Sequence, residues 1–202
     1  MKIYGYLSKV QYLGSLGILR LARDILISSL YVKKGAIVRW PFYIRKLGKL
    51  EIGRGARTGP GLVIDIIERN SILKIGDNFK AGSRLHIGCL KSVTIKENVL
   101  IASDVYISDH SHGQYNEIIS DDPNSIVNNR ILSQEDIVIN ENVWIGEKVC
   151  ILPGAEIGRN SIVGAGSVVN SKIPANSIVA GVPAKVIKMF DDNKRQWVRQ
   201  NA

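Results

Sequence analysis

The chain of 202 residues has an ordinary hydrophobic content of 45% and a net charge of +9 at pH 7, which fits one folded domain with appendages. No stretch reaches the roughly 18 uncharged apolar residues of a membrane-spanning helix, and none has the charged start, apolar run and cleavage site of a signal peptide. The positive charge is concentrated in residues 1–57, which hold 12 Lys and Arg residues against Asp24 and Glu51. Because the remainder is nearly neutral and lacks a face of mixed basic and aromatic residues, we expect no nucleic-acid partner.

An amphipathic helix is predicted within residues 1–31, where apolar residues recur around Arg20, Arg23 and Asp24. It belongs to a basic arm of residues 1–50, and two interpretations of it are open. In the first, the helix packs its apolar face on the open end of the following domain and caps it. In the second, it lies on an anionic membrane surface. The attraction would then come from the basic residues Lys2, Lys9, Lys33, Lys34, Arg39, Arg45 and Lys46.

A six-residue repeat occupies most of the chain from residue 51 to residue 186. β-Branched or small aliphatic residues stand at every sixth place, with a two-residue slip between Leu90 and Thr94: Ile75, Ala81, Ile87, Ile95, Ile101, Ile107, and then Ile139, Ile145, Ile151, Ile157, Val163 and Val169. This period suits short strands joined by corners, with one aliphatic side chain per strand pointing inward. Three such sides close a triangular coil, and a coil buries its aliphatics only when another coil stacks on it. The repeat therefore predicts an all-β solenoid.

Two segments fall outside the repeat. Residues 113–136 show no period and are rich in Asn, Asp and Ser, and a loop of this length within a compact repeat is usually functional. Residues 187–202 are predicted to form a short charged helix, with Lys194, Arg195 and Arg199 near its end and Trp197 packing back on the domain.

Two of the three histidines stand just before the long loop, in the sequence Asp109-His110-Ser111-His112-Gly113. His112 takes the sixth place of its hexad, so it should lie at a corner and point out of the core. Trp144 takes the same place in a later hexad, and we expect these two corners to lie near each other. Both imidazoles could instead serve turn formation, and Asp109 could either orient one imidazole or form the turn. The third histidine, His86, is expected to be a surface corner residue.

The repeat, together with the closing segment Ala180–Val186, resembles the hexapeptide acyltransferases, which fold as a left-handed parallel β-helix. The runs from Asn98 to His112 and from Asn142 to Gly146 are similar to the sugar acetyltransferases of that family. The resemblance alone implies the left-handed sense, a homotrimer with sites between subunits, acetyl-CoA as the donor and no metal. It implies that His112 is the general base, with His110 as the rival. It also implies a donor groove lined by Trp144, Gly146, Gly164, Ala165, Lys172 and Lys185. Trp144 could alternatively pack a corner, and the two lysines could be solvated charges.

The same resemblance implies an O-acetyltransferase that acts on a sugar hydroxyl of a bacterial surface glycan, such as an O-antigen, capsule or exopolysaccharide unit. We therefore expect a cytoplasmic enzyme with a glycan or lipid-linked sugar acceptor, and its basic arm could contact the inner face of the membrane. Three alternatives remain: an acceptor that is a small molecule (an antibiotic, a free sugar or serine), a zinc enzyme like the γ-type carbonic anhydrases, and a non-catalytic assembly module. The close spacing of His110 and His112 argues against the zinc enzyme.

Overall fold

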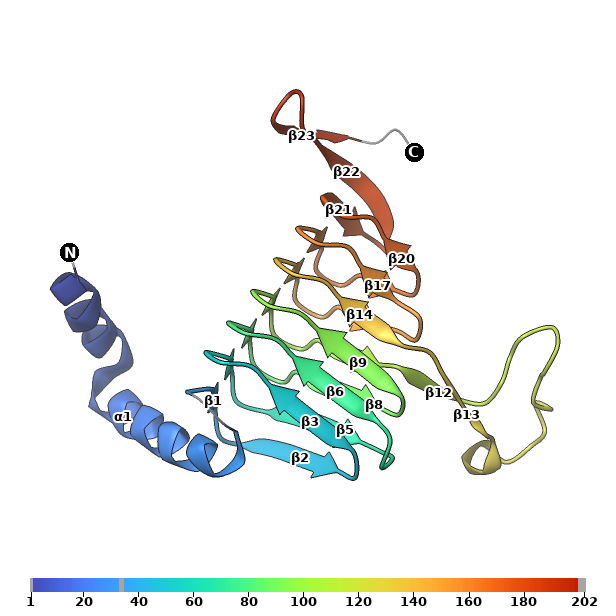
Figure 1. The fold of residues 1–202 in the computed structure, drawn as a ribbon, viewed down its shortest axis with the longest axis horizontal. Helices are drawn as coiled ribbons and strands as arrows, with labels where there is room; N and C mark the ends of the chain where they lie inside the picture. The colour runs from blue at the N-terminus through green and yellow to red at the C-terminus, as the bar shows by residue number, and fades with distance from the viewer. Residues whose placement is uncertain (1, 33–34, 200–202) are drawn as a thin grey trace.

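The computed structural model describes residues 2–32 and 35–199, which form a helix followed by a tapering stack of short strands (Figure 1). Three sheets of parallel strands, one of which ends in two antiparallel strands, make the sides of the stack, and the chain passes from one side to the next at each corner. The predicted all-β solenoid is confirmed.

The strands of each sheet recur once per coil. The first sheet contains β1 (Ile37–Val38), β4 (Arg57–Thr58), β7 (Lys80–Ala81), β10 (Leu100–Ile101), β15 (Trp144–Ile145), β18 (Ile162–Val163), β21 (Ser177–Ala180), β22 (Lys185–Asp191) and β23 (Gln196–Arg199). The second sheet contains β2 (Phe42–Lys46), β5 (Leu62–Ile66), β8 (His86–Cys89), β11 (Tyr106–Ser108), β16 (Cys150–Ile151) and β19 (Val168–Val169). The third sheet contains β3 (Lys49–Ile52), β6 (Ile72–Ile75), β9 (Ser92–Ile95), β14 (Ile137–Ile139), β17 (Glu156–Ile157) and β20 (Lys172–Ile173).

The core consists of the repeated aliphatic residues, stacked on one another in register. Ile101 lies opposite Ile145, Ile107 opposite Ile151, and Ile139 opposite Ile157. All of them are at most 1% exposed. A strand of two residues has little stability of its own, so burial of these side chains between coils must hold the strands together.

Asparagine occupies five positions between strands at which the backbone enters the left-handed region. Asn78, Asn98, Asn142, Asn160 and Asn176 have φ values between 54° and 58°, a conformation that Asn tolerates better than most residues. Their side-chain amides are also linked from coil to coil, for example Asn160 Nδ2 to Asn176 Oδ1 at 2.8 Å. The corner residues therefore fix both the local turn and the stacking.

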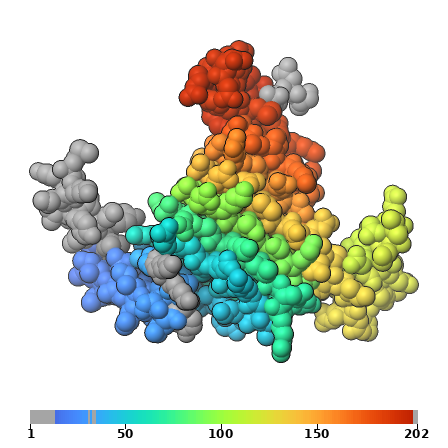
Figure 2. All heavy atoms as spheres, viewed as in Figure 1, coloured from blue at the N-terminus to red at the C-terminus, as the bar shows by residue number. Residues whose placement is uncertain are grey.

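The long loop leaves the solenoid at a corner between the second and third sheets. Its two ends form an antiparallel ribbon of β12 (His110–His112) and β13 (Leu132–Gln134), and a 3-10 turn spans Val127–Asn129. The loop projects from the side of the solenoid as a separate lobe (Figure 2). The chain then re-enters the third sheet at β14, which pairs directly with β9, so the stack continues without a gap.

Helix α1 (Lys2–Tyr31) lies beside β1 at the first coil and is kinked at Gly14, where φ is 61°. It packs through a polar contact, because Ser28 Oγ accepts the backbone N–H of Val38 at 2.8 Å and Asp24 and Ser28 are both buried. Within residues 14–30, most of its large apolar residues are exposed. The expectation that an apolar helix face caps the solenoid is thus wrong. Within the described residues, no helix is both long enough and apolar enough to cross a bilayer.

The two ends of the solenoid differ from their predicted boundaries. Strand pairing begins at Ile37, inside the segment expected to be an arm. The predicted C-terminal helix is wrong, because residues 185–199 form the antiparallel strands β22 and β23 on β21. The carboxylate of Asp191 accepts the backbone N–H groups of Asn193 and Lys194, both at 3.0 Å, and so makes a tight turn where a helix would continue. Phe190 and Trp197 pair across this hairpin with their ring centroids 5.4 Å apart.

We predict that Ile145→Ala lowers the free energy of unfolding by about 2–5 kcal/mol, because it leaves a cavity in a closely packed core. Chemical denaturation should measure this loss. Leu47→Ala is the control, because Leu47 is 70% exposed and its truncation should change stability by less than about 0.5 kcal/mol. Equal losses in the two variants would contradict the assignment of the core.

Candidate active site

Asp109 is the anchor of the candidate site, and it is completely buried at the end of β11. Its carboxylate accepts three backbone N–H groups from the preceding coil: Leu90 at 2.7 Å, and Lys91 and Ser92 at 2.8 Å each. Burial by itself raises the pKa of this carboxyl, but the hydrogen bonds from His110 and the backbone amides outweigh it and lower the pKa below its ordinary value. Asp109 is therefore a fixed negative charge that ties two coils together.

His110 is held by this carboxylate. Its Nδ1 lies 3.0 Å from Asp109 Oδ1, and its side chain is 13% exposed. The ring rests on the preceding coil, where a Cβ added at Gly88 would lie 3.1 Å from His110 Cε1. Asp109 fulfils both of the roles considered for it. It orients the imidazole of His110, and it closes the corner through its hydrogen bonds to the preceding coil.

His112 lies two residues further along β12 and is exposed. In a strand, residues i and i+2 share a face, so both imidazoles are on the same face of the ribbon. The ribbon is held by the 2.7 Å contact between the Ser111 and Ser133 hydroxyls. The phenol of Tyr115 donates to the His112 carbonyl. The His112 side chain has no hydrogen-bond or ionic partner among residues 2–32 and 35–199, so its ring nitrogens are available to a ligand.

The loop is an ordered structure built around Arg130. Its guanidinium donates to the Tyr115 hydroxyl at 2.9 Å, to the Ser125 hydroxyl at 2.9 Å and to the Ser125 carbonyl at 3.0 Å. Gly113 begins the loop with φ at 109°, and a Cβ there would come within 2.5 Å of the Tyr115 hydroxyl. His112 is thus followed by a turn that only glycine can make.

Most of the residues expected to line a donor groove lie together on another side of the solenoid. Trp144 is 51% exposed on the first sheet, between Leu100 and Ile162. Gly164 and Ala165 form the corner next to Gly146, and Lys185 is exposed at the start of β22 in the same sheet. Gly146 is buried, and a Cβ there would come within 2.6 Å of the Ala165 backbone nitrogen.

Two placements differ from the sequence-based expectations. Lys172 lies on the third sheet, apart from the other groove candidates, and pairs with Glu156 at 3.3 Å. Trp144 stands on β15 in the first sheet and not at a corner, whereas His112 stands on the ribbon that leaves between the second and third sheets. The expectation that the two residues occupy neighbouring corners is therefore wrong within one subunit. The hexad of Ile107 begins on the second sheet and that of Ile139 on the third, so the chain continues from the former into the loop ribbon and from the latter into β15 of the first sheet.

His86 is the remaining histidine and lies on β8, outside the loop ribbon. Its ring packs edge-on against Tyr106 with centroids 5.3 Å apart, and Nε2 lies 3.4 Å from Asp65 Oδ2. In the part of the chain that the structure describes, no group of three or more His, Cys, Asp or Glu side chains is arranged to hold a metal ion.

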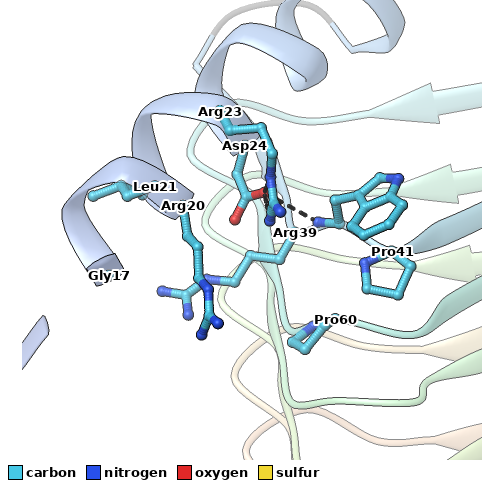
Figure 3. A pocket seen from close by; sticks show the side chains of 9 residues that line it. Gly17, Arg20, Leu21, Arg23, Asp24, Arg39, Pro41 and Pro60 are labelled. Atoms are coloured by element: carbon cyan, nitrogen blue, oxygen red, sulfur yellow. Dashed lines mark hydrogen bonds and ion pairs between the residues drawn. The ribbon is translucent and has the colours of Figure 1, made fainter. Parts of the chain in front are cut away.

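The sequence does not predict a cavity of about 530 Å³ that the structure contains. It lies between α1 and the first coil (Figure 3) and is lined by Gly17, Arg20, Leu21, Arg23, Asp24, Arg39, Trp40, Pro41 and Pro60. No periodic signal links residues 17–24 to residues 39–60, because their approach depends on which face the helix buries. In the sequence, only the concentration of basic residues in the N-terminal segment points to a site of this kind.

We predict that Asp109→Asn lowers the free energy of unfolding at pH 7 by about 1–3 kcal/mol, because buried backbone donors lose a charged acceptor. A carboxyl whose pKa is lowered on folding stabilises the protein above its unfolded pKa, ordinarily 3.8, and this contribution disappears as the pH falls through the folded value. The difference between the two proteins should therefore shrink below about pH 4 in denaturation experiments. A difference that stays constant down to pH 3 would contradict the role of the charge.

Comparison with known proteins agrees with this architecture. Residues 136–171 match the model of the bacterial transferase hexapeptide family (six repeats). The chain is 40% identical over 187 residues to the putative lipopolysaccharide biosynthesis O-acetyl transferase WbbJ of Escherichia coli K12, covering 91% of this chain and 94% of that one. It is 40% identical over 127 residues to the galactoside O-acetyltransferase of the same organism, which covers 63% of this chain and 59% of that one. The solved structure of a galactoside acetyltransferase in complex with coenzyme A superposes with a TM-score of 0.55 at 32% identity, over 79% of this chain and 71% of that one. The chain therefore belongs to the hexapeptide-repeat O-acetyltransferases.

Proposed function

We propose that this enzyme transfers the acetyl group of acetyl-CoA to a sugar hydroxyl of a bacterial surface glycan, with O-antigen units as the first candidates. The observation that carries the proposal is the likeness to the putative lipopolysaccharide O-acetyl transferase, which runs through 91% of the chain. A likeness confined to the repeat would support only the fold. The donor follows from the solved galactoside acetyltransferase, which binds coenzyme A.

In the proposed reaction His112 acts as the general base. Its neutral imidazole takes the proton from the acceptor hydroxyl while that oxygen attacks the thioester carbonyl, and collapse of the tetrahedral intermediate releases the coenzyme A thiolate, which then takes a proton. Exposure favours His112 over His110, because a base must reach the hydroxyl it deprotonates. His110 is largely covered, and we assign it a positioning role: with Asp109 it fixes the strand on which His112 stands.

We further propose that the working enzyme is a homotrimer with sites between subunits. His112 leaves a corner between the second and third sheets, whereas Trp144, Gly164, Ala165 and Lys185 lie on the first sheet or at its corner with the second. A base and a donor groove on different sides of one solenoid can meet only across neighbouring copies. The loop also exposes a set of apolar side chains suited to such a contact: Ile118, Ile119, Ile126, Val127 and Ile131.

We predict that His112→Ala lowers kcat/KM by about 10²- to 10⁴-fold, the usual contribution of a positioned base. Release of free thiol from acetyl-CoA should be followed with lipid-linked and nucleotide-linked sugars as acceptors. His110→Ala is the matched variant and should reduce the rate less while also lowering the midpoint of thermal unfolding. Wild-type turnover by the His112 variant, with the larger loss in the His110 variant, would transfer the base assignment to His110.

For the donor groove, we predict that Lys185→Ala raises the KM for acetyl-CoA about three- to tenfold with little change in kcat, because an exposed lysine contributes mainly to binding of the nucleotide phosphates. Lys172→Ala is the control of equal charge, since Lys172 lies on another sheet and is paired with Glu156. Steady-state rates at varied acetyl-CoA concentration measure both. A larger rise in KM for the Lys172 variant would place the groove on the third sheet.

A further inference from the structure

Within residues 14–30, helix α1 leaves most of its large apolar residues exposed. Leu16, Leu19, Leu26 and Leu30 are between 60% and 78% exposed. Their spacing of three, seven and four residues places them on one side of the helix. The side that contacts the solenoid carries Asp24 and Ser28. The fold therefore presents a leucine row, defined as these four residues, away from its own core.

The cavity beside this helix is rich in arginine. We call it the arginine pocket, for Arg20, Arg23 and Arg39, which line it together with Trp40. Arg23 is the only one of the three with an ionic partner among the described residues: its guanidinium lies 2.7 Å from Asp24 Oδ1 and 5.2 Å from the centre of the Trp40 ring. The side chains of Arg20 and Arg39 extend into the same space in Figure 3.

The charge of the pocket is unbalanced. Asp24 is the one acidic residue in its lining, and it is already engaged, because it also accepts the backbone N–H of Trp40 at 3.3 Å. Arg20 and Arg39 have no acidic partner in residues 2–32 and 35–199. Two unpaired guanidinium groups that line one cavity repel each other, and an anion between them would relieve that repulsion. Guanidinium groups match phosphate oxygens particularly well, through paired hydrogen bonds.

From these two features we infer that α1 lies on an anionic lipid surface, with the leucine row in the acyl boundary and the arginine pocket holding a lipid phosphate. An interfacial helix of this kind combines an apolar row with basic residues at headgroup level. Trp40 is 53% exposed beside the pocket, and tryptophan is well suited to the boundary between apolar and polar layers.

Charge favours a lipid surface over a second copy of the chain as the occupant. Residues 1–57 contain 12 basic and two acidic residues, so two copies of this end would repel each other. An anionic bilayer instead attracts every one of these charges within a Debye length. The inference concerns binding only and does not depend on the acetyl transfer proposed above, so it can fail while that proposal holds.

The test is co-sedimentation of the full chain with vesicles of phosphatidylglycerol and phosphatidylcholine, compared with vesicles of phosphatidylcholine alone. We expect binding to the anionic vesicles that weakens as salt is raised. Arg20→Gln combined with Arg39→Gln should lower the partition coefficient about tenfold or more. Leu19→Gln combined with Leu26→Gln should lower it to a similar extent at unchanged charge.

The control for the pocket is Arg159→Gln combined with Arg199→Gln, which removes the same charge from exposed positions between β17 and β18 and in β23. We expect this control to keep most of the binding. Absence of wild-type binding would overturn the inference, and an equal loss in the control would overturn the pocket as the phosphate site. If the leucine variant keeps vesicle binding but changes the subunit number measured by light scattering, the leucine row belongs to another copy and the inference is wrong.

Discussion

The stacking of one inward-facing aliphatic residue on its counterpart in the next coil is the constraint on which this structure depends. Strands of two residues, such as β15 and β16, cannot form a stable sheet by themselves. They persist because Ile101 and Ile145, and likewise Ile107 and Ile151, are buried against each other in register. Everything that faces outward, including both histidines of the ribbon and Trp144, is positioned by this inner column without being part of it.

The candidate site illustrates how the solenoid admits an irregular segment. The chain leaves after Asp109 and returns at Ile137, and the carboxylate of Asp109 replaces the missing corner by accepting the backbone N–H groups of residues 90–92. The same carboxylate binds His110. One buried charge therefore closes the corner and sets the direction in which the ribbon, with His112 on it, departs from the core. For that reason, a substitution of Asp109 should alter both the stability of the fold and the geometry of the candidate site.

Sequence reasoning predicted the solenoid well and the surroundings of the site less well. The period of six located the inward residues because burial between coils leaves no other choice at Ile139, Ile145 or Ile151. The partners of Asp109 lie 17 to 19 residues away, a separation set by coil stacking and invisible to local pattern. The expectation that the helix buries its apolar face fails because Asp24 and Ser28, which are outnumbered by apolar residues in the sequence, make the hydrogen bonds to the first coil. The prediction of a C-terminal helix fails because the charged residues of the tail also suit a hairpin turn around Asp191.

The register of the stack sets how such a chain can change its length. In the later coils Ile139 pairs with Ile157 and Ile145 with Val163, a repeat of 18 residues, whereas Ile87 pairs with Ile107 across 20 residues, the two additional ones lying at the corner that Asp109 closes. Loss of one complete turn would leave all later residues facing the same way, only lower by a strand spacing of about 4.8 Å. Loss of a single hexad would rotate every later corner by one side of the triangle. The solenoid can therefore become shorter or longer by whole coils, and the direction of each outward-facing side chain is then preserved.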